Sequence, residues 1–283
     1  MEIAACNVAA YEVAACGVTH RVSQTRRRVF DKFFTYAFAL ALGVASFGLP
    51  ALANTDQVFL RTYPLAAGGH FTLDNVNGSV EVEGWDRDEV EVRAVKTARV
   101  DSDDLDQVQI EVQNDPSDVA VHTRYPAGQG GEVAVEYRIH VPYRVLLGAV
   151  GTVNGSVCVK GVEGGGDLRS VNGNVDIVES SGRFSAKTTN GDLRLELRHL
   201  RNGEPMNLET VNGSVVLGLP SNAQANLEVQ NTNGDFYSEV PVTSTHALPG
   251  SRGFRGKLGQ GGGAISVRTV NGGIRLLREN PGV

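Results

Sequence analysis

The chain has 283 residues, of which 26 are Lys or Arg and 32 are Asp or Glu, and its formal net charge is −6. This acidic balance disfavours nucleic acid as a partner, because surfaces that bind nucleic acid carry an excess of Lys and Arg. The length is sufficient for a large buried core, and three cysteines are too few for the disulfide framework that holds small secreted domains together.

Residues 1–53 have the features of a signal peptide. A basic cluster at 26–32 precedes an uncharged, largely apolar run at 33–49, and Ala51-Leu52-Ala53 matches the small-x-small pattern of a cleavage site. We therefore expect export and cleavage after Ala53, with an uncleaved membrane anchor as the alternative. Arg27-Arg28 resembles a twin-arginine export signal, but the sequence is equally consistent with export by the Sec route. The residues before the basic cluster suggest an over-extended start codon.

Cleavage after Ala53 would remove five basic and three acidic residues and leave 21 basic and 29 acidic ones, a net charge of −8. We expect residues 54–283 to form a single exported domain, periplasmic or at the cell surface. No stable membrane span is expected once the leader has been removed.

A unit of about ten residues centred on Asn-Gly occurs seven times in this domain. An apolar residue stands four positions before each Asn, and a small polar residue stands two positions before it. Apolar residues also stand three and five positions after it, except that the sixth copy has Ser238 at the last position. The pairs are Asn77-Gly78, Asn154-Gly155, Asn172-Gly173, Asn190-Gly191, Asn212-Gly213, Asn233-Gly234 and Asn271-Gly272.

Apolar residues at every second position are typical of β-strands with one buried face, so each unit is predicted to be strand, corner, strand. Because Asn and Gly enter the left-handed backbone region most readily, we expect a sharp bend at each pair. The chain is therefore predicted to be all-β.

Two all-β architectures fit this pattern. In an antiparallel β meander or roll, each Asn-Gly would close a two-residue hairpin. In a right-handed β-solenoid, each Asn-Gly is the corner of a rung of about 20 residues. Successive Asn residues between Asn154 and Asn233 are 18, 18, 22 and 21 positions apart. This near-constant period favours the solenoid, in which aligned Asn amides could bond from rung to rung as a ladder inside the coil. We expect the last copy to end the stack.

Two segments depart from the repeat. Residues 84–149 contain three alternating stretches that predict an irregular β insertion, with the acidic run 101–106 and the glycine-rich run 128–131 as loops. Residues 241–263 are rich in glycine, which predicts a flexible loop.

The segment YRIHVPYRVLLGAVGTVNGSVCVKGVEG and the ending GQGGGAISVRTVNGGIRLLRE resemble a bacterial family of exported proteins known as putative adhesin domains. The resemblance covers roughly residues 70–278 and includes the apolar-Pro-x-x-x-apolar step from Val141 to Val145. It implies a solenoid-like β fold and an extracytoplasmic location, and it supplies no catalytic residues.

The outward positions of the repeat do not place paired carboxylates on successive rungs. The sequence therefore predicts no site for acid/base catalysis on the repeat. The histidines lack metal-ligand spacing, and no glycine run forms a phosphate-binding loop, so we expect no metal or cofactor. The one candidate ligand strip is cationic, formed by Arg169, Lys187 and Arg194, and would suit an anionic glycan or lipid headgroup.

Three functions remain open. The leading hypothesis is a non-enzymatic, exported protein that is adhesin-like or envelope-associated and binds or scaffolds a cell-surface or envelope glycan or protein. The alternatives are a carbohydrate-active enzyme on a β-helix and a structural envelope protein that self-associates. The sequence does not determine the oligomeric state.

Overall fold

The computed structural model describes residues 56–99, 103–126, 133–200, 203–248 and 253–279, which all belong to one compact unit that spans residues 54–283. The predicted signal peptide and the glycine run at 128–131 lie outside the described residues. Within the described residues, no helix is long and apolar enough to cross a membrane.

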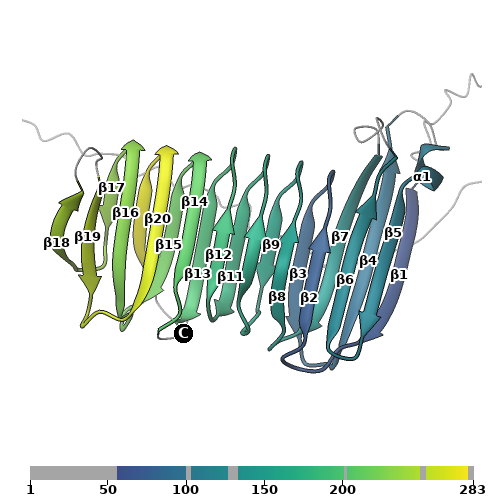
Figure 1. The fold of residues 1–283 in the computed structure, drawn as a ribbon, viewed down its shortest axis with the longest axis horizontal. Coiled ribbons are helices and arrows are strands. Elements are labelled where there is room, and N and C mark those ends of the chain that lie inside the picture. The colour runs from purple at the N-terminus through teal and green to yellow at the C-terminus, as the bar shows by residue number, and fades with distance from the viewer. Residues whose placement is uncertain (1–55, 100–102, 127–132, 201–202, 249–252, 280–283) are drawn as a thin grey trace, which may run out of the picture. The chain divides into compact units, whose positions relative to one another are not determined.

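Two β-sheets make up nearly the whole unit (Figure 1). In hydrogen-bonded order, sheet A consists of β1 (Asp56–Pro64), β4 (Glu89–Ala98), β7 (Val133–Pro142), β3 (Val80–Trp85), β9 (Val157–Lys160), β11 (Val175–Ser181), β13 (Leu193–His199), β15 (Val215–Pro220), β21 (Ile274–Glu279) and β17 (Phe236–Ser238). Sheet B consists of β18 (Val242–Leu248), β19 (Gly253–Leu258), β16 (Ala225–Asn233), β20 (Gly263–Asn271), β14 (Met206–Asn212), β12 (Phe184–Lys187), β10 (Gly166–Arg169), β8 (Leu146–Gly151), β2 (His70–Asp74), β6 (Asp118–Arg124) and β5 (Gln109–Asp115).

Each Asn-Gly pair joins a strand of sheet B to a strand of sheet A, and strands of successive rungs pair in parallel. At Asn190, for example, β12 lies in sheet B and β13 in sheet A. A hairpin would instead place the two strands side by side in one sheet. The solenoid-like arrangement is therefore confirmed, and the antiparallel meander is wrong.

The spatial order of the rungs differs from their order in the chain. The last rung, β20–β21, lies between β14–β15 and β16–β17, so that Asn271 is in register with Asn212 on one side and with Asn233 on the other. Our expectation that the last copy ends the stack is wrong, because β20 and β21 are paired on both edges.

The predicted apolar columns form the core between the sheets. Leu193 and Leu195 of β13 are fully buried, and their counterparts on β11 and β15 pair with them in register. Apolar side chains thus stack on apolar side chains from rung to rung.

The insertion at 84–149 closes one end of the stack. It contributes β4, β5, β6 and β7, in agreement with the three or more strands that its alternating stretches predict. The acidic run predicted as a loop contains the short helix α1 (Asp104–Gln107), whose Leu105 is buried against the core. A single apolar side chain thus anchors this polar segment.

The stretch 241–263 is not the flexible loop that its composition predicted. β18 and β19 form an antiparallel pair there, and β19 also pairs with β16. Leu258 is completely buried, and a Cβ on Gly256 would lie 2.6 Å from the Val242 Cγ1 atom. Close packing therefore explains glycine at this position, and that expectation is corrected for the described part of the stretch.

Candidate functional site

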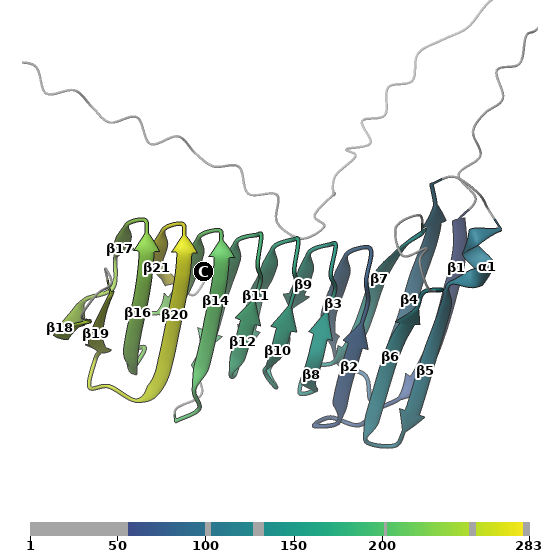
Figure 2. The ribbon, with the colours of Figure 1, turned by 45° about the horizontal axis from the view of Figure 1, so that its top comes forward.

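The corners between the two sheets lie in one row (Figure 2), and the seven Asn side chains at these corners form one continuous ladder. The rungs follow one another in the order Asn77, Asn154, Asn172, Asn190, Asn212, Asn271 and Asn233, and from Asn154 onward each Asn Nδ2 donates to the Oδ1 of the preceding Asn in this order, at 2.8 to 2.9 Å. Asn77, at the start of the ladder, only accepts. The ladder predicted from the sequence is confirmed. Its expected position inside the coil is wrong, because the amides lie on the exposed side of the corner.

A second column of hydrogen bonds is buried directly behind this ladder. The hydroxyl of Thr188 donates to the Gly173 carbonyl oxygen at 2.8 Å, and Ser170 bonds Gly155 at the same distance. Thr152, Thr210 and Thr269 repeat the contact, and Asn231 makes it with its amide. The sequence showed these small polar residues, but only the stacked rungs reveal their acceptors.

The glycine of each pair is required for close stacking between rungs. A Cβ on Gly191 would lie 2.1 Å from the Gly173 carbonyl oxygen, and the other six pairs give 1.9 to 2.2 Å. Among these glycines only Gly78 and Gly272 have positive φ, and no Asn of the repeat does. The left-handed bend that we expected at every pair is therefore wrong. Glycine is needed at the corner because a side chain there would collide with the backbone of the adjacent rung.

In a third column, the side chain two residues after one Asn accepts a hydrogen bond from the backbone N–H two residues after the Asn of the adjacent rung. Asn174 Oδ1 accepts from the Asp192 backbone N–H at 2.9 Å, and Asp192 Oδ1 accepts from that of Ser214 at 2.7 Å. The corner is thus held by three parallel series of hydrogen bonds, which gives the row of rungs a fixed spacing.

The predicted cationic strip is only partly assembled. Arg169 of β10 and Lys187 of β12 are register neighbours on the outer face of sheet B, and both are exposed. Lys187 Nζ forms an ion pair with Glu209 at 3.1 Å, whereas Gly151, next to Arg169 on the other side, has no side chain. Two of the three predicted residues, Arg169 and Lys187, are therefore adjacent, and we call this pair the cationic step.

Arg194 does not belong to this step, because β13 places it on sheet A. It forms an ion pair with Glu196 on its own strand, and its register neighbour is Asp176. Burial raises the pKa of the Asp176 carboxyl, Arg194 opposes that rise, and Asp192 and Glu196 add to it. Arg194 is thus neutralised within an acidic neighbourhood, and its assignment to the strip is wrong.

A cluster that the sequence did not predict lies on the outer face of sheet A. His140 Nδ1 is 3.4 Å from a Glu91 oxygen, and its Nε2 is 3.8 Å from a Glu83 oxygen. Lys160 Nζ also approaches Glu83, at 3.8 Å, and the Trp85 ring stacks on His140 with centroids 5.1 Å apart. These residues come from β3, β4, β7 and β9, so only the sheet pairing brings them together.

The described residues contain no group of three His, Cys, Asp or Glu side chains placed to hold a metal ion.

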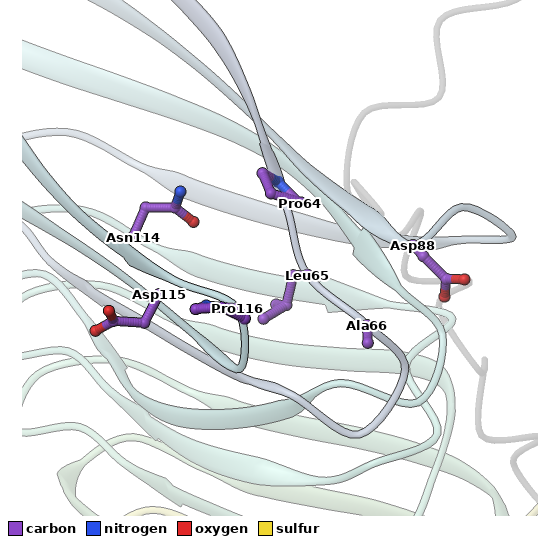
Figure 3. A pocket seen from close by; sticks show the side chains of 7 residues that line it. All are labelled: Pro64, Leu65, Ala66, Asp88, Asn114, Asp115 and Pro116. Carbon is purple, nitrogen blue, oxygen red and sulfur yellow. The ribbon is translucent and has the colours of Figure 1, made fainter.

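A pocket of about 310 Å³ lies at the end of the stack that carries β1 and β5 (Figure 3). It is lined by Pro64, Leu65, Ala66, Asp88, Asn114, Asp115 and Pro116, with Leu65 and Pro116 facing each other. This hollow is mainly apolar, and none of its lining residues belongs to either charged group described above.

Several solved bacterial structures are similar to this chain. A putative cell adhesion protein from Clostridium sporogenes is 12% identical, with 80% of this chain and 100% of that chain covered and a TM-score of 0.47. A putative adhesin from Bacteroides fragilis is 11% identical, with 79% and 97% covered and a TM-score of 0.38. A putative lipid binding protein from Parabacteroides distasonis is 8% identical, with 78% and 96% covered and a TM-score of 0.31.

No curated protein matches the chain. The profile of the family described as Toastrack DUF4097 matches residues 69–277, which include all seven Asn-Gly rungs. The chain belongs to the Toastrack DUF4097 family.

Proposed function

We propose that the chain is a non-enzymatic, exported protein that acts through its surface, as an adhesin-like or envelope-associated binding or scaffolding module. The observation that carries the proposal is the cationic step of Arg169 and Lys187 on the face of sheet B. Three series of hydrogen bonds at the corner fix the spacing of the rungs that present this step. A rigid array of this kind suits a ligand with regularly spaced anionic groups, and we favour an acidic glycan of the cell surface or envelope.

Arg169 is the main ligand contact in this proposal. Its neighbour Gly151 has no side chain to compete for space, and no described residue forms an ion pair with it, whereas Lys187 is partly neutralised by Glu209. A sulfate or carboxylate group could therefore contact the guanidinium without displacing an existing ion pair. Guanidinium also suits such groups because it donates two parallel hydrogen bonds.

The test is a glycan and extracellular-matrix array probed with the exported chain, followed by titration of the best ligand. We expect Arg169→Ala to weaken binding strongly and Lys187→Ala to weaken it less. Arg194→Ala is the matched control, because it removes an equal charge from sheet A. Equal losses in all three variants would show only a general charge effect, and an array with no ligand would contradict the proposal.

Export is tested separately by the N-terminus of the protein recovered from the envelope. The basic, apolar and Ala-x-Ala order of residues 26–53 supports a start at Asn54. Recovery of an intact residue 1–53 segment would contradict cleavage and favour the membrane anchor.

The cluster around His140 favours carbohydrate-active catalysis as a second candidate. Two carboxylates, Glu83 and Glu91, flank one imidazole on an open sheet face, and paired carboxylates are the usual groups of glycoside hydrolysis. Release of reducing ends from a polysaccharide panel, lost in Glu83→Gln and Glu91→Gln but kept in Glu209→Gln, would support this candidate over the first.

A further inference from the structure

The edge of sheet A formed by β1 differs from the edges formed by β5 and β17. β1 is nine residues long, and its one partner among the described strands is β4. Val58 and Leu60 lie on the same face of the strand and are 55% and 58% exposed. A long edge strand with exposed apolar side chains is a template for pairing with another chain.

The edge strands β5 and β17 are better protected. β5 carries Glu111, which forms an ion pair with Arg124 at 2.6 Å, and it has no large exposed apolar side chain. β17 has only three residues. Since short strands and charged side chains are the usual protection of sheet edges, β1 is the edge with least protection among these three.

We propose that β1 is a self-association surface, on which β1 of a second copy of this chain pairs antiparallel about a two-fold axis at Leu60. In this register Leu60 faces Leu60 of the partner subunit, and Val58 faces Thr62 of the partner subunit. Val58 and Leu60 of the two copies then form an apolar strip bordered by Thr62 on one face, and ten-stranded sheet A continues across the axis into the second copy.

The opposite face of β1 is complementary to itself in the same register. Phe59 of one copy faces Arg61 of the partner subunit, and this occurs twice because the axis is two-fold. Within one chain the Arg61 guanidinium already lies 5.4 Å from the centroid of the Phe59 ring, in the geometry of a cation–π contact. The only cation of β1 thus meets an aromatic ring, and no like charges face each other across the axis.

The two-fold axis also brings together α1 and the apolar pocket. α1 lies beside the start of β1, where the Gln57 amide donates to Asp106 at 3.4 Å. The pocket lies at the other end of β1, around Pro64 and Leu65. Antiparallel pairing places Gln57 of each copy opposite Tyr63 of the other, so α1 of one copy approaches the pocket of its partner. This inference is independent of the proposed ligand.

The register is tested by cysteine substitution in the full chain, expressed with its leader and recovered after export. Residues directly opposite in an antiparallel pair have Cα atoms about 4.5 to 5.5 Å apart, within the range of a disulfide. Leu60→Cys should therefore form a disulfide-linked dimer under mild oxidation. Val58→Cys is the matched control, because the two copies of residue 58 would lie about 13 Å apart. Cross-linking at Val58 as readily as at Leu60, or at neither, would overturn the register.

Self-association is measured by sedimentation velocity over a concentration series. We expect a reversible dimer, and Leu60→Lys should raise its dissociation constant at least about tenfold, because two lysines would face each other. Val171→Lys, which changes an exposed apolar residue at a corner, should leave the dimer unchanged. Circular dichroism would confirm that both variants are folded. A native chain that is monomeric at all concentrations, or equal dimerisation of both variants, would overturn the proposal.

Discussion

The Thr188 hydroxyl donates to the Gly173 carbonyl oxygen, 2.8 Å away on the adjacent rung, and Thr188 is completely buried. The two residues are 15 positions apart in the chain, and the contact joins the strand before one corner to the glycine of the preceding corner. Because equivalent contacts recur from rung to rung, this buried column holds adjacent corners together.

We predict that Thr188→Val destabilises the protein by about 1 to 3 kcal/mol, because it leaves the half-buried Gly173 carbonyl without its side-chain donor. Thr188→Ser should cost no more than about 1 kcal/mol, since it keeps the hydroxyl and loses one methyl group. Ser170 fills the same role on another rung. Denaturant midpoints of the two variants provide the measurement, and equal losses would show that the methyl group matters and the hydrogen bond does not.

The exposed ladder should contribute less. Asn190 bonds Asn172 and Asn212 through its amide, so Asn190→Ala should cost about 0.5 to 1.5 kcal/mol. Asn190→Gly should be at least as destabilised, because Asn190 does not have a left-handed backbone and glycine adds entropy to the unfolded chain. Recovery of stability in the glycine variant, measured by chemical denaturation, would contradict this account of the corner.

Glycine in the repeat should be far less replaceable than Asn. A Cβ at Gly191 would lie 2.1 Å from the Gly173 carbonyl oxygen, so Gly191→Ala forces adjacent rungs apart and should cost about 3 kcal/mol. Gly273→Ala is the control, because its Cβ would meet its nearest neighbour at an ordinary 3.5 Å. Thermal midpoints that fall equally in both variants would show that steric contact between rungs is not the cause.

The glycine-rich segment should contribute to stability. Leu258→Ala is expected to cost about 2 to 5 kcal/mol, because the leucine of β19 is fully buried. Deletion of 253–258 should lower the thermal midpoint further, since it removes the partner of β18 and one partner of β16. A deletion variant as stable as the native chain would restore the interpretation of this stretch as a loose loop.

Asp176 should make stability depend on pH. Burial raises the pKa of its carboxyl in the folded state above the usual 3.8, so folding disfavours the charged form. Stability should therefore fall as pH rises from 3.8 through the raised pKa. Asp176→Asn should be more stable than the native chain at pH 7, and the difference should vanish below pH 3.8, where the carboxyl is protonated in both states. Denaturant midpoints across this range provide the measurement, and a difference independent of pH would contradict the prediction.

The sequence alone determined the repeating unit of strand, corner and strand. Apolar residues at every second position fix which face of each strand is buried, and near-constant spacing of Asn-Gly fixes a parallel stack, because aligned side chains must recur at equal intervals. For this reason the Asn ladder and the core columns could be predicted residue by residue from local pattern.

The tertiary structure decided everything that depends on contacts between rungs. The last rung lies between the fifth and the sixth because β14 and β16 each offer an edge that β20 can pair, and periodicity does not encode that order. Sheet pairing separates Arg194 from Arg169 and brings His140 to Glu83 and Glu91. Glycine at each corner has the same origin, because the atom that excludes a side chain belongs to the adjacent rung and not to the local chain.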